Sequence, residues 1–326
     1  RRGRPPLGSG AGPGREYGVG AGRICGAGRS VKVLLTGCAG FIGSKVAEHL
    51  VRAGHEVLGV DNLDPAYPVV LKAWRLKNLE PARGFSFRPG SILDRAFLEA
   101  LWAEAGPFEA VINLAARAGV RQSLRRPHSY YEVNVLGSLN LLELCRHRGV
   151  PTFILASTSS LYGEGPRPFR EDQPTDRPLS PYAASKKAAE VLAYTYHRLF
   201  GLDVAVLRYF TVYGPAGRPD MSIFRFVRRI AEGLPIVVYG DGTQERDFTY
   251  VGDVARGTVT ALRLRGFEII NLGSDRPVEL NRVILTIEGI LGRQAVIDRR
   301  PRHPADVGAT WANISKARDL LGWQPA

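Results

Sequence analysis

A tyrosine and a lysine four residues apart have the types and spacing needed for acid–base chemistry. Residues at i and i+4 lie on one face of a helix, so Tyr182 and Lys186 should face the same substrate. We expect the lysine ammonium to favour the phenolate and so to lower the pKa of Tyr182. Thr158 follows a predicted strand over residues 152–156 and can hydrogen-bond the hydroxyl that the phenolate deprotonates. The alternative is that Tyr182 only begins its helix, because Tyr-x-x-x-Lys spacings also arise by chance.

A glycine-rich turn upstream has the spacing of a dinucleotide-phosphate site. The three glycines of Gly37–Gly43 stand between a predicted strand and a predicted helix. Such a turn lets the backbone approach a pyrophosphate, and the helix N-terminus offers it free N–H groups and a positive dipole end. Asp61 lies 18 residues after Gly43, where a carboxylate accepts hydrogen bonds from ribose hydroxyls and repels a 2′-phosphate. We therefore expect NAD, while the neighbouring Asn62 and Lys72 keep NADP open as an alternative.

Apolar runs and helical spacings place these residues in an alternating series of strands and helices. Buried strands are expected over residues 31–36, 56–60, 110–114, 152–156 and 204–209. Helices are expected over residues 41–52, 131–146 and 182–200. The alternation predicts an α/β fold, a Rossmann-type doubly wound parallel sheet with helices on both faces. A smaller interleaved α/β lobe should contain a helix near 222–232, strands at 236–239 and 268–272, and a helix near 280–291.

The chain divides into three predicted parts. Residues 1–30 contain ten glycines and are expected to form a disordered extension. Residues 31–210 are expected to form the dinucleotide-binding domain, which also receives part of 246–275. Residues 211–326 are expected to form the substrate-binding lobe.

The chain also carries an excess of positive charge. Lys and Arg total 44 against 31 Asp and Glu, a net charge of +13, and residues 1–30 supply five of these charges. The remaining cations are dispersed, which favours an anionic small-molecule substrate over nucleic acid. The sequence contains no apolar run long enough to span a membrane, and its three scattered cysteines form no metal signature or disulfide framework. We therefore predict a cytoplasmic protein with no metal site and no membrane contact.

Several stretches together resemble the extended short-chain dehydrogenases/reductases that act on nucleotide sugars. The resemblance runs from about residue 31 to residue 325, and residues 208–221 are most similar to the UDP-glucuronate 4-epimerases. The stretches that carry it are Gly37–Gly43, Asp61, Asn113–Ala116, Ser157–Gly163, Tyr182–Lys186 and Arg246–Val251, and Leu71–Leu79 and Ala118–Arg121 fit the same subfamily.

This resemblance implies a reaction. It is the NAD-dependent, reversible C4 epimerisation of UDP-glucuronate to UDP-galacturonate through a 4-keto intermediate. Ser159 and Ser160 stand where similar dehydratases carry an Asp-Glu pair and decarboxylases carry a Glu. Neither serine can act as a carboxylate acid or base, so elimination is disfavoured and the usual marker of the decarboxylases is missing. A UDP-glucose/galactose 4-epimerase and a UDP-glucuronate decarboxylase remain alternatives. A basic dinucleotide-sensing or nucleic-acid-associated protein is the alternative from a different class.

The resemblance also implies a ligand for each part of the substrate. Arg218 and Thr211 would hold the uronate carboxylate out of the alignment that loses CO2, unless Arg218 is only a surface loop residue. Arg246 would bind the diphosphate and Asp306 the uridine ribose, while a solvated surface cation is the alternative for Arg246 and for Arg121. The predicted substrate contacts are Arg121, Thr158, Ser159, Ser160, Thr211, Arg218, Val237, Tyr239, Arg246 and Asp306, with backbone groups of Val237 and Tyr239 facing uracil.

The cofactor contacts and the assembly follow from the same resemblance. Ser91 replaces an aspartate that is usual near adenine, and the chain stops where relatives carry one more helix, so we expect a shortened C-terminal lobe. Relatives pair through helices that match residues 131–146 and 182–200, which implies a homodimer. The predicted cofactor contacts are Gly37, Gly40, Phe41, Ile42, Gly43, Asp61, Asn62, Ser91, Ile92, Leu114, Ala115, Ala116, Asn134, Tyr182, Lys186 and Tyr209.

Overall fold

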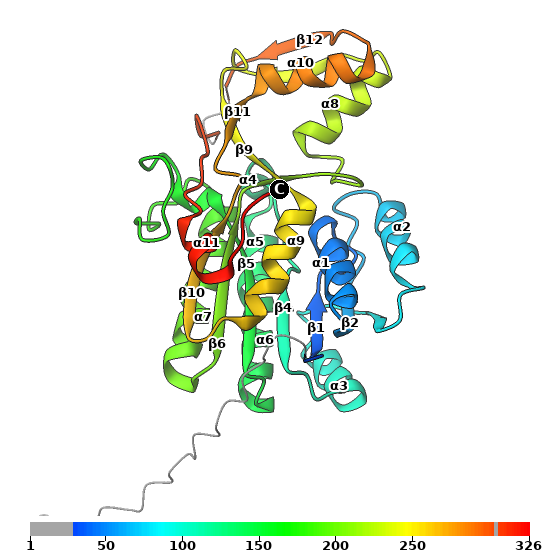
Figure 1. Cartoon of the computed structure of the whole chain (residues 1–326), viewed down its shortest axis with the longest axis vertical. Helices are drawn as coiled ribbons and strands as arrows, with labels where there is room; N and C mark the ends of the chain where they lie inside the picture. Colours follow the sequence, from blue (N-terminus) through cyan, green and yellow to red (C-terminus); the bar gives the residue numbers. More distant parts are fainter. Residues whose placement is uncertain (1–28, 303–305) are drawn as a thin grey trace, which may run out of the picture.

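A seven-stranded parallel sheet forms the centre of the computed structural model, which describes residues 29–302 and 306–326 (Figure 1). The strand order is β10-β6-β5-β4-β1-β2-β3, so the direction of winding reverses between β1 and β4. Ligands of such sheets bind in the crevice at the carboxyl ends of the strands on either side of this reversal. The predicted fold class is confirmed. The strands are β1 (Lys32–Thr36), β2 (Glu56–Asp61), β3 (Phe85–Pro89), β4 (Ala110–Asn113), β5 (Thr152–Thr158), β6 (Asp203–Tyr209) and β10 (Phe267–Leu272).

Two hydrophobic cores hold helices against the two faces of the sheet. Leu35 belongs to the core under α1 (Phe41–Arg52) and α9 (Val251–Thr260), whereas its neighbour Leu34 belongs to the opposite core. This alternation follows from the two-residue period of a strand, and burial of both faces explains why β1 reads as a continuous apolar run. The opposite core also holds α3 (Arg95–Ala105), α6 (Gly137–Arg148) and α7 (Pro181–Phe200).

The helix predicted over residues 131–146 is interrupted. Residues 131–146 do not form a single α-helix, because α5 (Pro127–Tyr131) runs into a π-helical turn, η1 (Glu132–Leu136), before α6 begins. Within this turn the Asn134 side chain accepts a hydrogen bond from the Arg117 N–H at 2.8 Å and donates to the Arg117 carbonyl at 3.0 Å. The wider turn thus lets the Asn134 side chain hydrogen-bond the backbone of the loop after β4. Helix α4 (Val120–Arg125) follows that loop.

A smaller lobe stands above the sheet in Figure 1 and has a separate core. The helices α8 (Ser222–Ala231) and α10 (Leu280–Leu291) pack around Phe226, Ile230 and Ile284. Strand β8 (Ile236–Tyr239) pairs in parallel with β12 (Ile297–Arg300), and the predicted limits of β8 and α10 are confirmed. A three-stranded sheet, β11 (Pro277–Glu279), β9 (Glu245–Tyr250) and β7 (Thr211–Tyr213), connects the lobe to the large sheet.

The chain beyond residue 211 does not stay in the small lobe. Helix α9 packs against α1, β10 completes the large sheet beside β6, and α11 (Ser315–Leu321) contacts β10. The Trp323 side chain is fully buried and its indole N–H donates to the Asp253 carbonyl at 2.8 Å. The remaining elements are helix α2 (Val69–Leu79) and the short 3-10 turns η2 (Ser159–Tyr162) and η3 (Ala261–Arg263).

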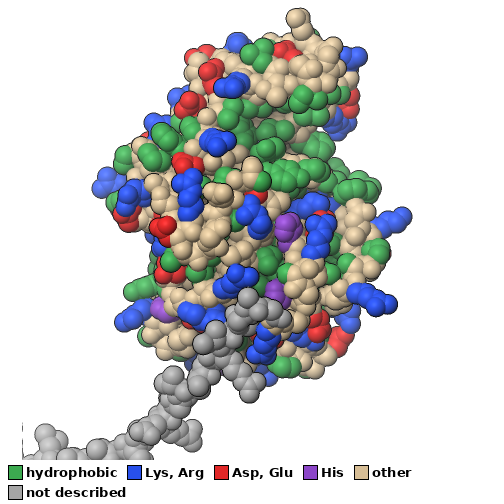
Figure 2. Space-filling view, viewed as in Figure 1, with side chains coloured by type: hydrophobic (Ala, Val, Ile, Leu, Met, Phe, Trp, Pro, Cys, Tyr) green, Lys and Arg blue, Asp and Glu red, His purple; other side chains and the backbone are tan. Residues whose placement is uncertain are grey.

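The described surface is of mixed charge. On the face seen in Figure 2, Lys and Arg side chains are interspersed with acidic ones, and hydrophobic side chains gather between the small lobe and the large domain. None of the described helices combines the length and the apolar character that crossing a bilayer requires. The predicted extension lies outside the described residues, except for Arg29 and Ser30.

Candidate active site

A cavity of about 570 Å³ opens at the carboxyl ends of the parallel strands. Of the predicted cofactor contacts, all but Asn134 line this cavity, and Tyr182 and Lys186 line it from α7. Asn134 is instead fully engaged with the Arg117 backbone and with the Ser185 hydroxyl, so it braces the loop after β4. Ser91 lines the cavity, and its hydroxyl accepts a hydrogen bond from the Leu93 N–H at 3.2 Å.

The glycine turn leaves no room for side chains. Gly37 has a φ of +73° and donates its N–H to the Val60 carbonyl at 2.7 Å. A Cβ atom on Gly43 would stand 2.0 Å from the Gly37 carbonyl oxygen, and one on Gly37 would stand 2.6 Å from the Ala115 nitrogen. The turn therefore brings bare backbone and the first N–H groups of α1 to the cavity wall, an arrangement that fits a dinucleotide pyrophosphate.

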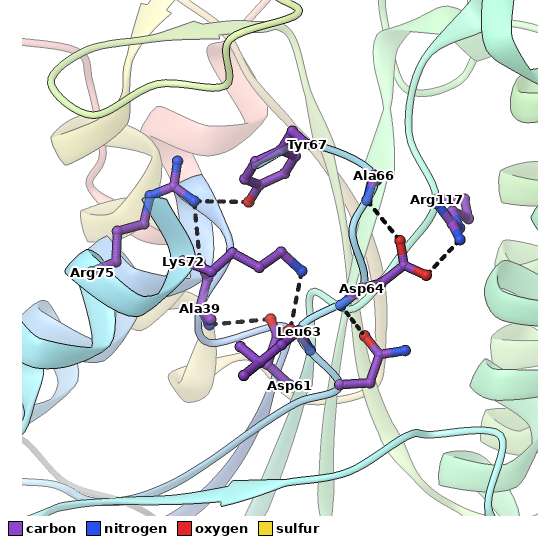
Figure 3. A network of polar contacts seen from close by, with 10 residues as sticks. Ala39, Asp61, Leu63, Asp64, Ala66, Tyr67, Lys72, Arg75 and Arg117 are labelled. Atoms are coloured by element: carbon purple, nitrogen blue, oxygen red, sulfur yellow. Dashed lines mark hydrogen bonds and ion pairs between the residues drawn. The ribbon is translucent and has the colours of Figure 1, made fainter. Parts of the chain in front are cut away.

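Asp61 ends β2 and is held by three donors (Figure 3). One carboxylate oxygen accepts from the Leu63 N–H at 2.8 Å and from the Lys72 ammonium at 3.1 Å, and the other accepts from the Ala39 N–H at 3.2 Å. These contacts fix the carboxylate beside the glycine turn, where ribose hydroxyls of a dinucleotide would meet it. Lys72 comes from α2, a helix that the sequence analysis did not predict.

The catalytic candidates come from the end of β5 and the start of α7. Ser180 caps α7 by accepting a hydrogen bond from the Ala183 N–H at 3.2 Å, which places Tyr182 in the first turn and Lys186 one turn later. The Lys186 ammonium donates to the Ala156 carbonyl of β5 at 2.9 Å. Thr158 is the last residue of β5, two residues beyond the predicted end of that strand, and its hydroxyl donates to the Ser160 hydroxyl at 3.1 Å.

We expected Lys186 to lower the pKa of Tyr182, and in the protein by itself this prediction is wrong. Burial raises the pKa of Tyr182, while the Thr158 hydroxyl and the Arg218 guanidinium act in the opposite direction. Burial also lowers the pKa of Lys186 to about 8, opposed by the Glu190 carboxylate. Desolvation thus favours the neutral form of both groups, because each loses more by leaving water than it gains from nearby charge.

A buried polar network behind Lys186 was missed by the sequence analysis. Glu190 lies one turn after Lys186 on α7 and accepts from the Arg208 guanidinium at 2.8 and 3.0 Å. It also accepts from the Ser157 hydroxyl at 2.6 Å, next to Thr158. Arg208 and Glu190 are almost completely buried, so this bidentate pair fixes α7 against β5 and β6. The i+4 spacing from Lys186 to Glu190 was the available signal.

Four of the predicted UDP ligands meet between the large domain and the small lobe. The Arg121 guanidinium pairs with the Asp306 carboxylate and lies 3.8 Å from the centre of the Tyr239 ring. Arg246 donates to the Glu245 and Gly308 carbonyls at 2.7 and 3.3 Å. Burial lowers the pKa of Arg246, opposed by the Asp306 carboxylate.

Val237 lies in β8 with Tyr239, where one edge of the strand backbone is already paired with β12. Arg121 and Asp306 were expected to contact different parts of the substrate, yet here they contact each other.

Arg218 stands at the boundary of two cavities. It lines the main cavity and also a second one of about 270 Å³, and Thr211 lines only the second. The Arg218 guanidinium binds the Asp220 carboxylate bidentately at 2.6 and 3.0 Å and donates to the Ala118 carbonyl at 3.3 Å. It is therefore fixed between the loop before α4 and the loop before α8.

Thr158, Ser159 and Ser160 are not among the residues that line the main cavity. Tyr209 lines that cavity, and its hydroxyl lies 2.8 Å from the buried Thr258 hydroxyl.

The family model of NAD dependent epimerases/dehydratases matches residues 33–273 of the chain. The chain belongs to this family. A UDP-glucuronate 4-epimerase of Thermodesulfobacterium geofontis (strain OPF15) is 54% identical over 293 residues, which are 90% of either protein.

Two solved members of the epimerase/dehydratase family are also similar. The crystal structure of UDP-glucuronic acid 4-epimerase from Bacillus cereus in complex with UDP-glucuronic acid and NAD has a TM-score of 0.85 at 38% identity, covering 90% of this chain and 94% of that one. UDP-glucose 4-epimerase from Thermotoga maritima with UDP-glucose has a TM-score of 0.81 at 34% identity, covering 90% and 93%. Among the described residues of our chain, no three His, Cys, Asp or Glu side chains lie together as a metal site would require.

Proposed function

We propose that this chain is an NAD-dependent UDP-glucuronate 4-epimerase that interconverts UDP-glucuronate and UDP-galacturonate. The observation that carries the proposal is that Tyr182, Lys186 and Arg218 line the same cavity as the glycine turn. A phenol, an ammonium and a guanidinium thereby line one cavity, and the Arg218 guanidinium would exchange part of its contact with Asp220 for a ligand carboxylate. The 54% identity to a UDP-glucuronate 4-epimerase supports the same substrate.

The residues of the chain supply binding and proton transfer. Gly37, Gly43 and Asp61 would hold NAD, which supplies a reversible hydride acceptor for C4 of the sugar when it is bound. Tyr182 would take the proton from the C4 hydroxyl and return it, with Thr158 orienting that hydroxyl. Lys186, held by the Ala156 carbonyl, would place its positive charge beside the phenol as the proton leaves.

The substrate side separates epimerisation from its alternatives. Ser159 and Ser160 follow Thr158 and carry no carboxylate, so the chain has no acid–base pair there for elimination or decarboxylation. Arg218 and Thr211 would hold the uronate carboxylate. The 4-keto uronate would then keep its carboxylate away from the alignment that favours loss of CO2.

The UDP handle is assigned to the cluster between the two domains. Arg246 would bind the diphosphate, and Asp306 the uridine ribose. Arg121 would exchange part of its contact with Asp306 for the sugar side of the ligand. The backbone of Val237 and Tyr239 would face uracil from the free edge of β8. In this division residues 31–210, with part of 246–275, bind NAD, and residues 211–326 bind the substrate.

We further propose a cytoplasmic homodimer. The cysteines Cys38 and Cys145 are free and buried, which suits a reducing compartment. Exposed apolar residues on α7 and in the turn before α6 support pairing through this side of the domain.

The deciding experiment is incubation of the purified protein with UDP-glucuronate and NAD, followed by chromatographic separation of the nucleotide sugars. UDP-galacturonate as the product supports the proposal. UDP-xylose would assign a decarboxylase. Conversion of UDP-glucose in a parallel reaction, without turnover of UDP-glucuronate, would assign the other epimerase, for which the Thermotoga maritima enzyme is the precedent. An Arg218→Ala variant should lose the preference for UDP-glucuronate over UDP-glucose.

A further inference from the structure

Arg75 is a buried cation in α2, only 3% exposed, that spans two loops of the site. One terminal nitrogen donates to the Ala39 carbonyl at 3.1 Å and to the Tyr67 hydroxyl at 2.8 Å. The other donates to the Ala216 carbonyl at 2.6 Å and to the Gly217 carbonyl at 3.4 Å. Figure 3 shows the first of these nitrogens directed at Ala39 and Tyr67. One side chain therefore connects segments that are far apart in the sequence.

The two segments belong to different halves of the site. Ala39 lies inside the glycine turn, and its N–H donates to the Asp61 carboxylate. Ala216 and Gly217 directly precede Arg218, the proposed ligand of the uronate carboxylate. Arg75 thus fixes the backbone before Arg218 to the backbone that faces the cofactor.

The local geometry of the Arg218 loop depends on this anchor. Ala216 has a φ of +54°, a left-handed conformation that costs free energy for a residue with a Cβ atom. The Tyr67 ring lies between two guanidiniums, with its centre 5.4 Å from the Arg75 carbon Cζ and 6.0 Å from that of Arg218. The bond to the Ala216 carbonyl and the contacts with Tyr67 together oppose relaxation of the loop.

The contacts of Arg75 connect backbone groups of two loops and neutralise no charge. The acceptors of Arg75 are three carbonyls and a phenol, none of which carries a formal charge. Its Nε makes no hydrogen bond within the described chain, and burial lowers the pKa of this guanidinium. An apolar side chain at position 75 would leave the Ala39, Ala216 and Gly217 carbonyls without this donor. What an apolar side chain cannot do is fix several carbonyls of two loops at once.

We propose that Arg75 is a positioning residue for carboxylate recognition, which holds the 214–218 loop against the cofactor turn so that Arg218 faces the substrate. The inference rests on the proposed function, because it takes Arg218 to bind the uronate carboxylate. It assigns a functional task to α2, whose buried face carries Lys72 to the cofactor side and Arg75 to the substrate side.

The test compares how tightly the protein binds UDP-glucuronate, UDP-glucose and UDP, by calorimetry in the presence of saturating NAD. The readout is the ratio of the Kd for UDP-glucose to the Kd for UDP-glucuronate. Arg75→Met should lower this ratio by about tenfold, the cost of a misplaced charged hydrogen bond. The Kd for UDP should stay within about twofold, because the proposed UDP ligands lie at the other cluster. The control Lys77→Met removes an exposed cation from the same helix and should change neither value.

Arg75→Lys keeps the charge and carries the test if Arg75→Met does not fold. One ammonium cannot reach both the Ala39 and Ala216 carbonyls, so the ratio should again fall, by about threefold or more. In an Arg218→Ala background, Arg75→Met should not change the ratio further, because the group that Arg75 positions is already absent.

Each contrary outcome has one meaning. Weaker binding of all three ligands with an unchanged ratio would mean that Arg75 serves only the fold, and the inference would be overturned. An equal loss of ratio with and without Arg218 would also overturn it. Failure of the parent protein to epimerise UDP-glucuronate would overturn the proposed function itself, and this is measured on the unmodified chain.

Discussion

Tyr182 and Lys186 share one cavity, yet burial rather than their mutual charge governs both groups. Burial raises the pKa of the Tyr182 phenol, and the Thr158 hydroxyl and the Arg218 guanidinium oppose this shift. Tyr182 lines the main cavity, and in the proposed mechanism its phenol oxygen accepts the substrate proton. We expect Tyr182→Phe to lower turnover of UDP-glucuronate by about 100-fold to 10,000-fold, the usual contribution of a positioned acid–base group.

The Tyr182→Phe measurement follows UDP-galacturonate formation over time. NAD binding, monitored by calorimetry, serves as the control and should remain near that of the parent, because the glycine turn and Asp61 are unchanged. A variant that turns over at the parent rate would remove Tyr182 from the proposed mechanism.

Lys186 makes a pH-dependent contribution to stability with a defined sign. Its pKa is lowered from 10.5 to about 8 in the folded protein, so between these values the unfolded chain binds more protons than the folded one. The free energy of unfolding contributed by this lysine must therefore rise as the pH rises through that window.

Urea unfolding of the parent and of Lys186→Met isolates this contribution. The parent should gain stability relative to the variant by on the order of 1 kcal/mol between about pH 7.5 and about pH 9.5. A difference that stays constant over this interval would show that Lys186 keeps its ordinary pKa in the folded chain, and a difference that falls would show that its pKa is raised.

At the scale of elements, the turn between β1 and α1 is fixed by backbone contact. A Cβ atom on Gly43 would meet the Gly37 carbonyl at 2.0 Å, and neither group is the flexible end of a side chain. We expect Gly43→Ala to destabilise the fold by about 1–3 kcal/mol and to weaken NAD binding by at least about tenfold.

Gly289→Ala is the matched control for that substitution. Gly289 lies in α10 with no neighbour within 4 Å of its ideal Cβ position, so alanine should stabilise the helix by up to about 1 kcal/mol. Thermal unfolding and NAD titration of both variants check the pair. Normal NAD affinity in Gly43→Ala would show that the turn can shift without loss of the site.

The elements that could be predicted are those whose pattern agrees with their environment. Helix α1 begins after a glycine turn and alternates apolar and polar residues with helical period, and its predicted limits are confirmed. Helix α2 has the reverse character, because it buries Lys72 and Arg75 while Val70 is 75% and Trp74 is 54% exposed. A hydrophobic pattern could not locate a helix whose buried face carries two cations.

The same distinction applies to the site. Local spacing located Tyr182, Lys186 and the glycine turn, since each motif is contained in one element. The pairing of Arg121 with Asp306 joins residues 185 positions apart, and its two partners come from different domains. The direction of the Tyr182 pKa depends on burial, which a sequence pattern does not contain.

At the scale of the whole molecule, one apolar face of the large domain is exposed. Helices α6 and α7 pack beside each other. The turn before α6 exposes Leu136 at 52%, and α7 exposes Val191 and Tyr194 at 53% and 49%. In the proposed homodimer this face would meet its copy in a four-helix contact, and stable contacts of this kind bury about 1,600 Å² in total.

Val191→Glu should convert the proposed dimer into a monomer. In a two-fold interface each substitution occurs twice, so two carboxylates would be desolvated in an apolar contact, and Lys187 one turn away on each copy would offset only part of that cost. Light scattering after size-exclusion chromatography gives the mass. The matched control is Leu285→Glu on α10, which is 66% exposed and lies in the small lobe, far along the chain from this face. A dimer that survives Val191→Glu but dissociates with Leu285→Glu would place the interface on the small lobe instead.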